Sequence, residues 1–299
     1  MARRALATAA TAATAAAAAA AAALGMLVVA APAAASASVP SIWPAHGQAA
    51  YVLGGGHLRT SPGQHAVPIA SVAKVMTAYL VLRAHPIAAG RSGFVLTIRA
   101  RDVRDLRRRT ARGESVVVVR AGERLTERQA LAALLLPSAN NVAILLARRV
   151  SGTVSAFVRA MNRAARALRM RHTVYTDPSG FDPATRSTAA DQLRLAQAAL
   201  RDRFFRVMVS RRQARIPVVG RVRNRDTLLH HDGFVGVKTG SMSASGGCFV
   251  FRSHRIVAGR RVDLVGVVLG QRGGDLVQAG LRAAKRLVDR VAPRRGSNS

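Results

Sequence analysis

The sequence predicts an α/β protein of the α+β type, with a mainly antiparallel sheet flanked by helices and an inserted all-helical subdomain. Three observations support this prediction. Short strand-like segments come first, helical patterns then occupy most of residues 126–200, and strands return after Pro217. An amphipathic segment at 275–291 closes the folded region as a helix. Because strands occur on both sides of the helical block, we expect one sheet built from opposite ends of the chain.

The first 37 residues are expected to lie outside the folded domain. Arg3 and Arg4 precede a long uncharged, alanine-rich run, and Ala35-Ser-Ala37 offers a small-x-small cleavage site, which is the layout of a secretory signal. The alternative is an uncleaved N-terminal anchor, because the uncharged run is long enough to span a membrane. In both cases we expect an exported, extracytoplasmic protein, at the cell wall or the outer face of the membrane. The predicted organisation is a signal peptide at 1–37, a linker at 38–48, the folded domain at 49–291 and a disordered tail at 292–299.

The first part of the domain is predicted to contain a hairpin, one helix and two strands. Residues 50–68 suggest a short hairpin around three glycines. From Ser71 the apolar residues recur at helical spacing, and this helix should stop before Pro86. The apolar runs 94–98 and 115–119 have the composition of strands.

The helical block carries clear start and stop signals. Thr126-Glu-Arg-Gln129 has the form of a capping box, and the helix that it opens should run to Leu136, before Pro137. Turn residues fill the segment from Asp177 to Pro183. The remaining helices are expected at 142–150, at about 154–170 and, capped by Ser187-Thr188, up to about Leu200, and the later strands at 234–240, 248–251 and 262–269.

The chain is strongly basic, with 46 lysine and arginine residues, 14 acidic residues and a formal net charge of +32. Such a charge attracts polyanions, including nucleic acid and anionic wall polymers. The arginines are spread over nearly every segment, and only 4% of residues are aromatic, which leaves little surface for stacking bases. We therefore expect no nucleic-acid partner and interpret the charge as a solvated, arginine-rich surface that favours an anionic cell wall.

Neither a disulfide nor a metal cofactor is expected. Cys248 is the only cysteine, and its flanking residues resemble a strand, so a buried unreactive thiol is favoured over a catalytic one. His230 and His231 are adjacent in a turn, and no pair of histidines has metal-ligand spacing. We predict a reaction that needs neither zinc nor another cofactor.

Lysine is scarce, since Lys74, Lys238 and Lys285 are the only lysines in a chain rich in arginine. Arginine stays protonated at any ordinary pH, whereas a lysine in a dry pocket can lose its proton and act as a base. Lys74 follows Ser71 by three positions, so a helix would place both side chains on one face. A neutral amine there could remove the serine proton and activate the hydroxyl as a nucleophile. The alternative is an exposed lysine on a helix face.

Two further motifs accompany this pair. Lys238-Thr-Gly240 follows an apolar run, so it should end a strand or lie within one. The lysine would supply positive potential, the Thr239 hydroxyl could bind a substrate carboxylate, and Gly240 would let a substrate backbone approach closely. Ser138-Ala-Asn140 carries little weight alone, but its position between the other motifs increases it. Together the three motifs predict an active site.

In this order the motifs resemble S-x-x-K, S-x-N and K-T-G of the serine D,D-peptidases in the penicillin-binding protein group, particularly the low-molecular-mass D-alanyl-D-alanine carboxypeptidases. The likeness covers roughly residues 48–291 and extends through Pro68-Ile-Ala-Ser-Val-Ala-Lys74, Leu136-Pro-Ser-Ala-Asn-Asn141, Asp177-Pro-Ser-Gly180, Ser187-Thr-Ala189 and Gly236-Val-Lys-Thr-Gly240. The resemblance implies a β-lactamase/D,D-peptidase-like fold. It also implies an enzyme that removes the terminal D-Ala from peptidoglycan stem peptides ending in D-Ala-D-Ala and that is acylated and inhibited by β-lactam antibiotics.

The resemblance implies catalytic roles for the residues of the first two motifs. Ser71 would be the acylated nucleophile and Lys74 its general base. Ser138 would relay protons toward the leaving amine, and Asn140 would hold the peptide amide of the substrate. Lys238 would hold Ser138 in place. Burial and the nearby Lys238 should both lower the pKa of Lys74.

The third motif is implied to bind substrate. Lys238 would shape the local field, Thr239 would receive the terminal carboxylate, and Gly240 would lie beside the substrate backbone. The backbone N–H groups of Ser71 and Ser241 would form the oxyanion hole, a contribution worth several kcal/mol where one donor has been removed.

The sequence departs from the family pattern in three ways. Asn141 stands where many relatives have aspartate, a change that we expect to lie outside the reacting groups. Ser241-Met-Ser243 replaces a bulkier residue followed by threonine, which could alter affinity for penicillin or the stem peptide. We also expect the additional C-terminal β-domain and amphipathic anchor of some relatives to be missing.

Three other functions remain open at this point. A class A β-lactamase uses a glutamate between the second and third motifs, whereas Glu114, Glu123 and Glu127 all precede Ser138. A non-catalytic penicillin-binding or wall-binding regulator would keep the pocket without turnover. An exported glutaminase is the most remote alternative.

Overall fold

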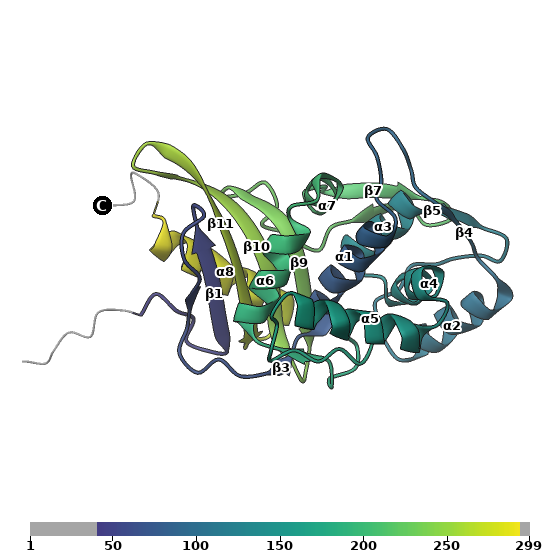
Figure 1. Cartoon of the computed structure of the whole chain (residues 1–299), viewed down its shortest axis with the longest axis horizontal. Coiled ribbons are helices and arrows are strands. Elements are labelled where there is room, and N and C mark those ends of the chain that lie inside the picture. The colour runs from purple at the N-terminus through teal and green to yellow at the C-terminus, as the bar shows by residue number, and fades with distance from the viewer. Residues whose placement is uncertain (1–40, 294–299) are drawn as a thin grey trace, which may run out of the picture. The chain divides into compact units, whose positions relative to one another are not determined.

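The computed structural model describes residues 41–293, whose framework is a five-stranded antiparallel sheet (Figure 1). The strands lie in the order β2-β1-β11-β10-β9. Their bounds are Gln48–Leu53 for β1, Arg59–Thr60 for β2, Phe234–Met242 for β9, Gly246–Val257 for β10 and Arg260–Gln271 for β11. β1 pairs with β11 along its whole length. The predicted antiparallel sheet, built from segments far apart in the sequence, is therefore confirmed.

Successive side chains of the central strands face two separate cores, as the period of a strand requires. Phe249 and Phe251 of β10 pack toward α8 (Leu276–Val291), whereas Val250 between them faces the core formed with the other helices. α6 (Ala189–Ala199) contacts β1, β10 and β11 from that second face. The sheet is thus covered by helices on both sides (Figure 1).

The inserted region lies beside β9 and is mainly helical (Figure 1). Its helices are η1 (Ala70–Ala73), α1 (Lys74–Ala84), α2 (Ala100–Ala111), α3 (Glu127–Leu135), α4 (Asn140–Ser151), α5 (Val154–Ala167) and α7 (Arg203–Val209). α1 contacts α3, α4, α5 and α6, so the helix that follows Ser71 forms the centre of this region. The predicted capping box is present, because Thr126 N–H donates to Gln129 Oε1 and Gln129 N–H donates to Thr126 Oγ1.

Short two-stranded pairs also belong to the inserted region and its borders, so it is not entirely helical. The pairs are β3 (Val67–Pro68) with β6 (Arg186–Ser187), β4 (Val95–Thr97) with β5 (Arg124–Thr126), and β7 (Gln213–Ile216) with β8 (Gly220–Arg223). β4 lies within the strand predicted at 94–98, and β3 lies at the end of the predicted hairpin at 50–68. The other four strands of these pairs were not predicted.

The arginine-rich segment 99–112, interpreted from the sequence as solvated surface charge, forms the helix α2. Asp102 begins this helix by accepting a hydrogen bond from Arg99 N–H at 2.9 Å. Asp102, Asp105 and Leu106 are buried, while most of the arginines stay exposed. Asp105 and Leu106 follow Asp102 by three and four positions, which is the spacing of one helix face. Two of these three residues are charged, so the apolar pattern in the sequence did not reveal the helix.

The prediction of a strand at 115–119 is wrong. This segment has no strand partner in the described region. Instead, the Asn141 side chain donates to Val117 C=O at 2.8 Å and accepts from Val117 N–H at 3.2 Å. One amide side chain therefore satisfies the two backbone groups that a neighbouring strand would otherwise pair.

The predicted signal peptide (1–37) lies outside the described residues, as does most of the predicted tail (292–299). The predicted linker (38–48) is described from residue 41. Within it, Trp43 packs against the ring of Tyr51 at a centroid distance of 5.5 Å, and its last residue begins β1. Among residues 41–293 no single helix is long and apolar enough to cross a membrane. The pair α4 and α5, bent by 84°, meets those criteria only when taken together.

The turn at 177–180 packs directly against the start of α1. Gly180 has φ of +75°, and a Cβ at this position would lie 1.8 Å from Ala70 C=O and 2.9 Å from Ala73 Cβ. No side chain fits there unless the turn moves away from the helix.

Replacement of Gly180 by alanine should therefore lower the free energy of unfolding by about 3 kcal/mol, which combines overpacking with a left-handed backbone. Gly152→Ala is the matched control, because Gly152 has φ of +73° but no atom within 4 Å of the added Cβ. It should lose only about 1 kcal/mol. Urea unfolding measures both values, and equal losses would contradict the steric argument.

Candidate active site

Ser71 and Lys74 lie together at the start of α1. Ser71 is in the 3₁₀ turn η1, and Lys74 is the first residue of the α-helix. The Lys74 Nζ donates a hydrogen bond to Ser71 Oγ at 2.8 Å. Lys74 is 0% exposed, whereas Ser71 is partly exposed. The hydroxyl is thus reachable from outside, while the amine beside it is removed from water.

The turn at 177–180 holds the lysine amine from the other side. Lys74 Nζ donates a second hydrogen bond to Ser179 C=O at 2.9 Å, and Thr77 Oγ1 donates to Pro178 C=O at 2.6 Å. The Asp177 carboxylate shapes this turn by accepting, at 3.0 Å each, from Ser179 N–H, Gly180 N–H and Thr185 Oγ1. Segments about one hundred residues apart in the sequence therefore fix the position of the amine.

Ser138 and Ala139 lie in the break between α3 and α4 that Pro137 predicted, and Asn140 is the first residue of α4. Asn140 Nδ2 donates to Glu114 Oε2 at 2.8 Å. Ser138 Oγ and Asn140 Oδ1 are buried and have no hydrogen-bond partner among residues 41–293. The expected hydrogen bond between Lys238 and Ser138 is accordingly not formed. Both oxygens are therefore unpartnered acceptors in the interior of the described region.

Backbone strain is concentrated beside these motifs. Ala70, just before Ser71, has φ of +46°, and Ser138 has φ of +71°. Non-glycine residues in this region cost about 1–3 kcal/mol and persist where the surroundings over-determine them. At Ala70 the surrounding constraint is the close contact with Gly180 described above.

Lys238-Thr-Gly240 runs along β9 next to η1. A Cβ on Gly240 would lie 3.0 Å from Val72 N and 3.1 Å from Ser71 N, so glycine permits the close approach of the two backbones. Lys238 is buried and its Nζ donates to Thr239 C=O at 2.8 Å. Ser241 follows on the same strand and is partly exposed. The first and third motifs are thus adjacent.

Burial lowers the pKa of Lys74 to about 7. Charged neighbours act in both directions, since Asp177 and Glu114 raise the pKa and Arg225 and Arg109 lower it. A large fraction of this amine is therefore unprotonated at neutral pH, unlike an ordinary lysine.

Burial also holds the pKa of Lys238 well below its usual range, and Lys74 and Arg225 lower it further. Because the repulsion between two cations acts on both, this coupling agrees with the predicted effect of Lys238 on Lys74, to which Arg225 and Arg109 add. Asp226 is buried near Lys238, and burial raises its pKa to about 7 while Lys238 opposes that shift.

Four charged residues belong to the site that no motif identified: Arg109, Glu114, Arg225 and Asp226. Glu114 was considered in the sequence only as a β-lactamase glutamate, and its place before Ser138 argued against that role. Its contact with Asn140 spans 26 residues. The only signal in the sequence that could have singled out Glu114 is that glutamate is rare in this chain.

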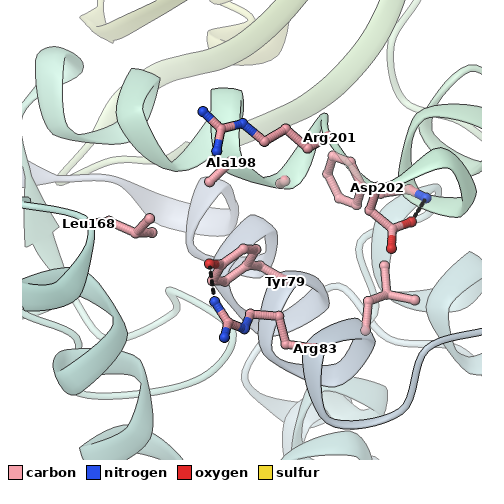
Figure 2. Close-up of a pocket in the computed structure, with 9 residues that line it drawn as sticks. Tyr79, Arg83, Leu168, Ala198, Arg201 and Asp202 are labelled. Atoms are coloured by element: carbon pink, nitrogen blue, oxygen red, sulfur yellow. Dashed lines mark hydrogen bonds between the residues drawn. The ribbon is translucent and has the colours of Figure 1, made fainter.

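A cavity of about 480 Å³ lies away from the motif residues (Figure 2). It is lined by Tyr79, Leu82, Arg83, Leu168, Ala198, Ala199, Arg201, Asp202 and Phe205. Figure 2 shows Arg83 turned toward the Tyr79 hydroxyl, to which it donates at 3.0 Å, and Asp202 accepts from Phe205 N–H at 2.8 Å. The active-site assignment therefore depends on the geometry of the motifs and not on this cavity.

Cys248 and the histidines take no part in the site. Cys248 is buried on β10, which confirms the predicted buried thiol on a strand, and burial raises its pKa to about 11. Within residues 41–293, no group of three histidine, cysteine or acidic side chains is arranged to hold a metal ion.

Comparison with known proteins gives the same family as the motifs. Among curated proteins, the chain is 37% identical over 134 residues to a D-alanyl-D-alanine endopeptidase of Pseudomonas aeruginosa, covering 44% of this chain and 40% of that protein. It is 30% identical over 151 residues to the D-alanyl-D-alanine carboxypeptidase of Streptomyces strain K15, covering 45% and 52%. The chain therefore spans about half the length of these relatives.

The fold matches solved structures over a longer stretch. The crystal structure of the Streptomyces K15 DD-transpeptidase superposes with a TM-score of 0.71 at 25% identity, covering 83% of this chain and 97% of that one. The family model for D-alanyl-D-alanine carboxypeptidases matches residues 57–273, a range that contains all three motifs. Because this match covers most of the chain, the protein belongs to the D-alanyl-D-alanine carboxypeptidase family.

Proposed function

We propose that this protein is a serine-type D-alanyl-D-alanine carboxypeptidase that removes the terminal D-Ala from peptidoglycan stem peptides. The observation that carries the proposal is the buried Lys74 amine, 2.8 Å from the partly exposed Ser71 hydroxyl. A pKa of about 7 suits this amine to act as a base near neutral pH. Family membership and the adjacent Lys238-Thr-Gly240 strand support the same activity.

In the proposed acylation, Ser71 Oγ attacks the carbonyl carbon between the two D-Ala residues and Lys74 takes the hydroxyl proton. The N–H groups of Ser71 and Ser241 would stabilise the oxyanion. As the C–N bond breaks, the leaving D-Ala amine gains a proton through Ser138. Water then attacks the ester, releases the shortened peptide and restores the Ser71 hydroxyl.

Substrate binding is assigned to groups that are available on the other two motifs. The unpartnered Asn140 Oδ1 would accept from the substrate peptide amide. Thr239 would bind the terminal carboxylate within the positive field of Lys238, and Gly240 gives the substrate room to lie along β9. β-Lactams would enter by the same route and acylate Ser71. We also propose export, on the basis of the N-terminal signal pattern, and an anionic wall as the surrounding surface.

One alternative activity is favoured by a specific finding. The relative at 37% identity is named an endopeptidase, a word that denotes cleavage of an internal bond rather than release of a terminal residue. Both reactions would use the same acyl-enzyme, so the site geometry does not separate them. Substrate assays distinguish the two activities, as described below.

Acylation should depend on both residues of the first motif. Intact-mass measurement after penicillin treatment should show one covalent adduct on the wild-type protein and none on Ser71→Ala. Lys74→Arg keeps a positive charge but cannot act as a base, so its acylation rate should fall by about 10²–10⁴-fold. A near-normal rate for Lys74→Arg would disprove the assigned base.

The released product identifies the reaction. A carboxypeptidase should free D-Ala from a pentapeptide stem, whereas an endopeptidase should instead split crosslinked muropeptide dimers. Penicillin labelling without either product would support the non-catalytic regulator, and rapid release of hydrolysed penicillin would support a β-lactamase. Ser71→Ala is the control in each assay.

The acylation rate should increase with pH through about 7, because the neutral fraction of Lys74 follows its pKa. At pH 5 about one amine in a hundred would be neutral, so the rate should be about 100-fold below its plateau. Stopped-flow acylation with a chromogenic β-lactam between pH 5 and 9 measures the profile. A rate that is constant over this range would contradict a titrating Lys74.

A further inference from the structure

Glu114 lies behind the Ser138-Ala-Asn140 turn. Its side chain is 0% exposed, and Asn140 Nδ2 donates to its Oε2 at 2.8 Å. The neighbouring main chain adds a second connection, since Asn140 N–H donates to Ser115 C=O at 2.7 Å. Two hydrogen bonds thus attach the start of α4 to residues 114–115.

Arg109 fixes the Glu114 carboxylate in turn. Its Nη1 lies 2.6 Å from Glu114 Oε2, and its Nε donates to Asp105 Oδ2 at 2.7 Å. The Glu114 N–H also donates to Arg109 C=O at 3.1 Å. Arg109 is held by α2, so the carboxylate reaches Asn140 from a rigid support.

An ionised carboxylate can only accept hydrogen bonds, so it orients the Asn140 amide with Nδ2 toward Glu114. This orientation leaves Oδ1 and the second N–H of Nδ2 for a bound peptide group. The charge of Glu114 also acts on Lys74, where it opposes the effect of Arg109.

We propose that Glu114, clamped by Arg109, is a positioning residue that holds the Asn140 amide in its reactive orientation and supplies negative charge behind the Lys74 amine. The proposal rests on the proposed function, because it assigns Glu114 a role in Ser71 acylation. Glu114 does not touch the substrate in this arrangement. It acts through Asn140 and through its field.

The test compares acylation rate against pH for variants of the full-length protein. Glu114→Gln removes the charge, so the acid limb of the profile should move to lower pH by about 0.5 unit. Its plateau rate should also fall by about tenfold, because a glutamine can present either its oxygen or its nitrogen to Asn140 and so no longer fixes the orientation of that amide. Arg109→Gln removes the opposing charge and should move the acid limb to higher pH.

Two further variants separate the two effects. Glu114→Asp keeps the charge but shortens the side chain, so the acid limb should stay in place while the plateau rate falls. Glu123→Gln is the matched control, because Glu123 bonds to Arg120 N–H and is not among the charges acting on Lys74. It should leave the whole profile unchanged.

Thermal unfolding of each variant shows whether it is folded before its rates are compared. If Glu114→Gln does not fold, Glu114→Asp and Arg109→Gln still decide the matter. The role of Glu114 would be overturned if the acid limbs of Glu114→Gln and Arg109→Gln both stay where they are in the wild-type protein. It would also be overturned if these two limbs move in the same direction. A wild-type protein that penicillin never acylates would instead overturn the proposed function and this role with it.

Discussion

The removal of the Lys74 amine from water is the constraint on which the rest of the site depends. Burying a charged ammonium costs free energy, so the Lys74 amine binds its proton less tightly. It is therefore partly neutral at pH 7. The fold limits this cost with the Ser179 carbonyl and with the negative charges of Asp177 and Glu114. The amine is thereby kept near the balance between its protonated and its neutral form, and a general base that acts at neutral pH requires this balance.

Three separate parts of the fold carry the motif residues. η1 presents Ser71, β9 passes beside it at Gly240, and Asn140 at the start of α4 bonds to Glu114, whose charge acts on Lys74. A sheet edge and a helical region therefore each supply part of one site. Both Ala70 and Ser138 have positive φ, and at Ala70 the strained backbone accompanies the close approach of Gly180.

The sequence predicted the fold class, most helices and the motifs, because each has a local signal such as the Thr126 capping box or the scarcity of lysine. It failed where long-range contacts decide the structure. Residues 115–119 have strand composition, but Asn141 takes the hydrogen bonds of Val117. The role of Glu114 was equally hidden, because only folding brings its carboxylate to Asn140. Burial of Asp226 beside Lys238 likewise has no signature in the sequence.

The pairing of β1 with β11 joins segments more than two hundred residues apart. Such long-range contacts form slowly, because a large loop must close before the pairing stabilises the chain. Ser71 thus emerges early in synthesis but meets its β9 neighbours only after most of the polypeptide has been made. An incomplete chain therefore carries Ser71 without the strand that lies beside it in the folded protein.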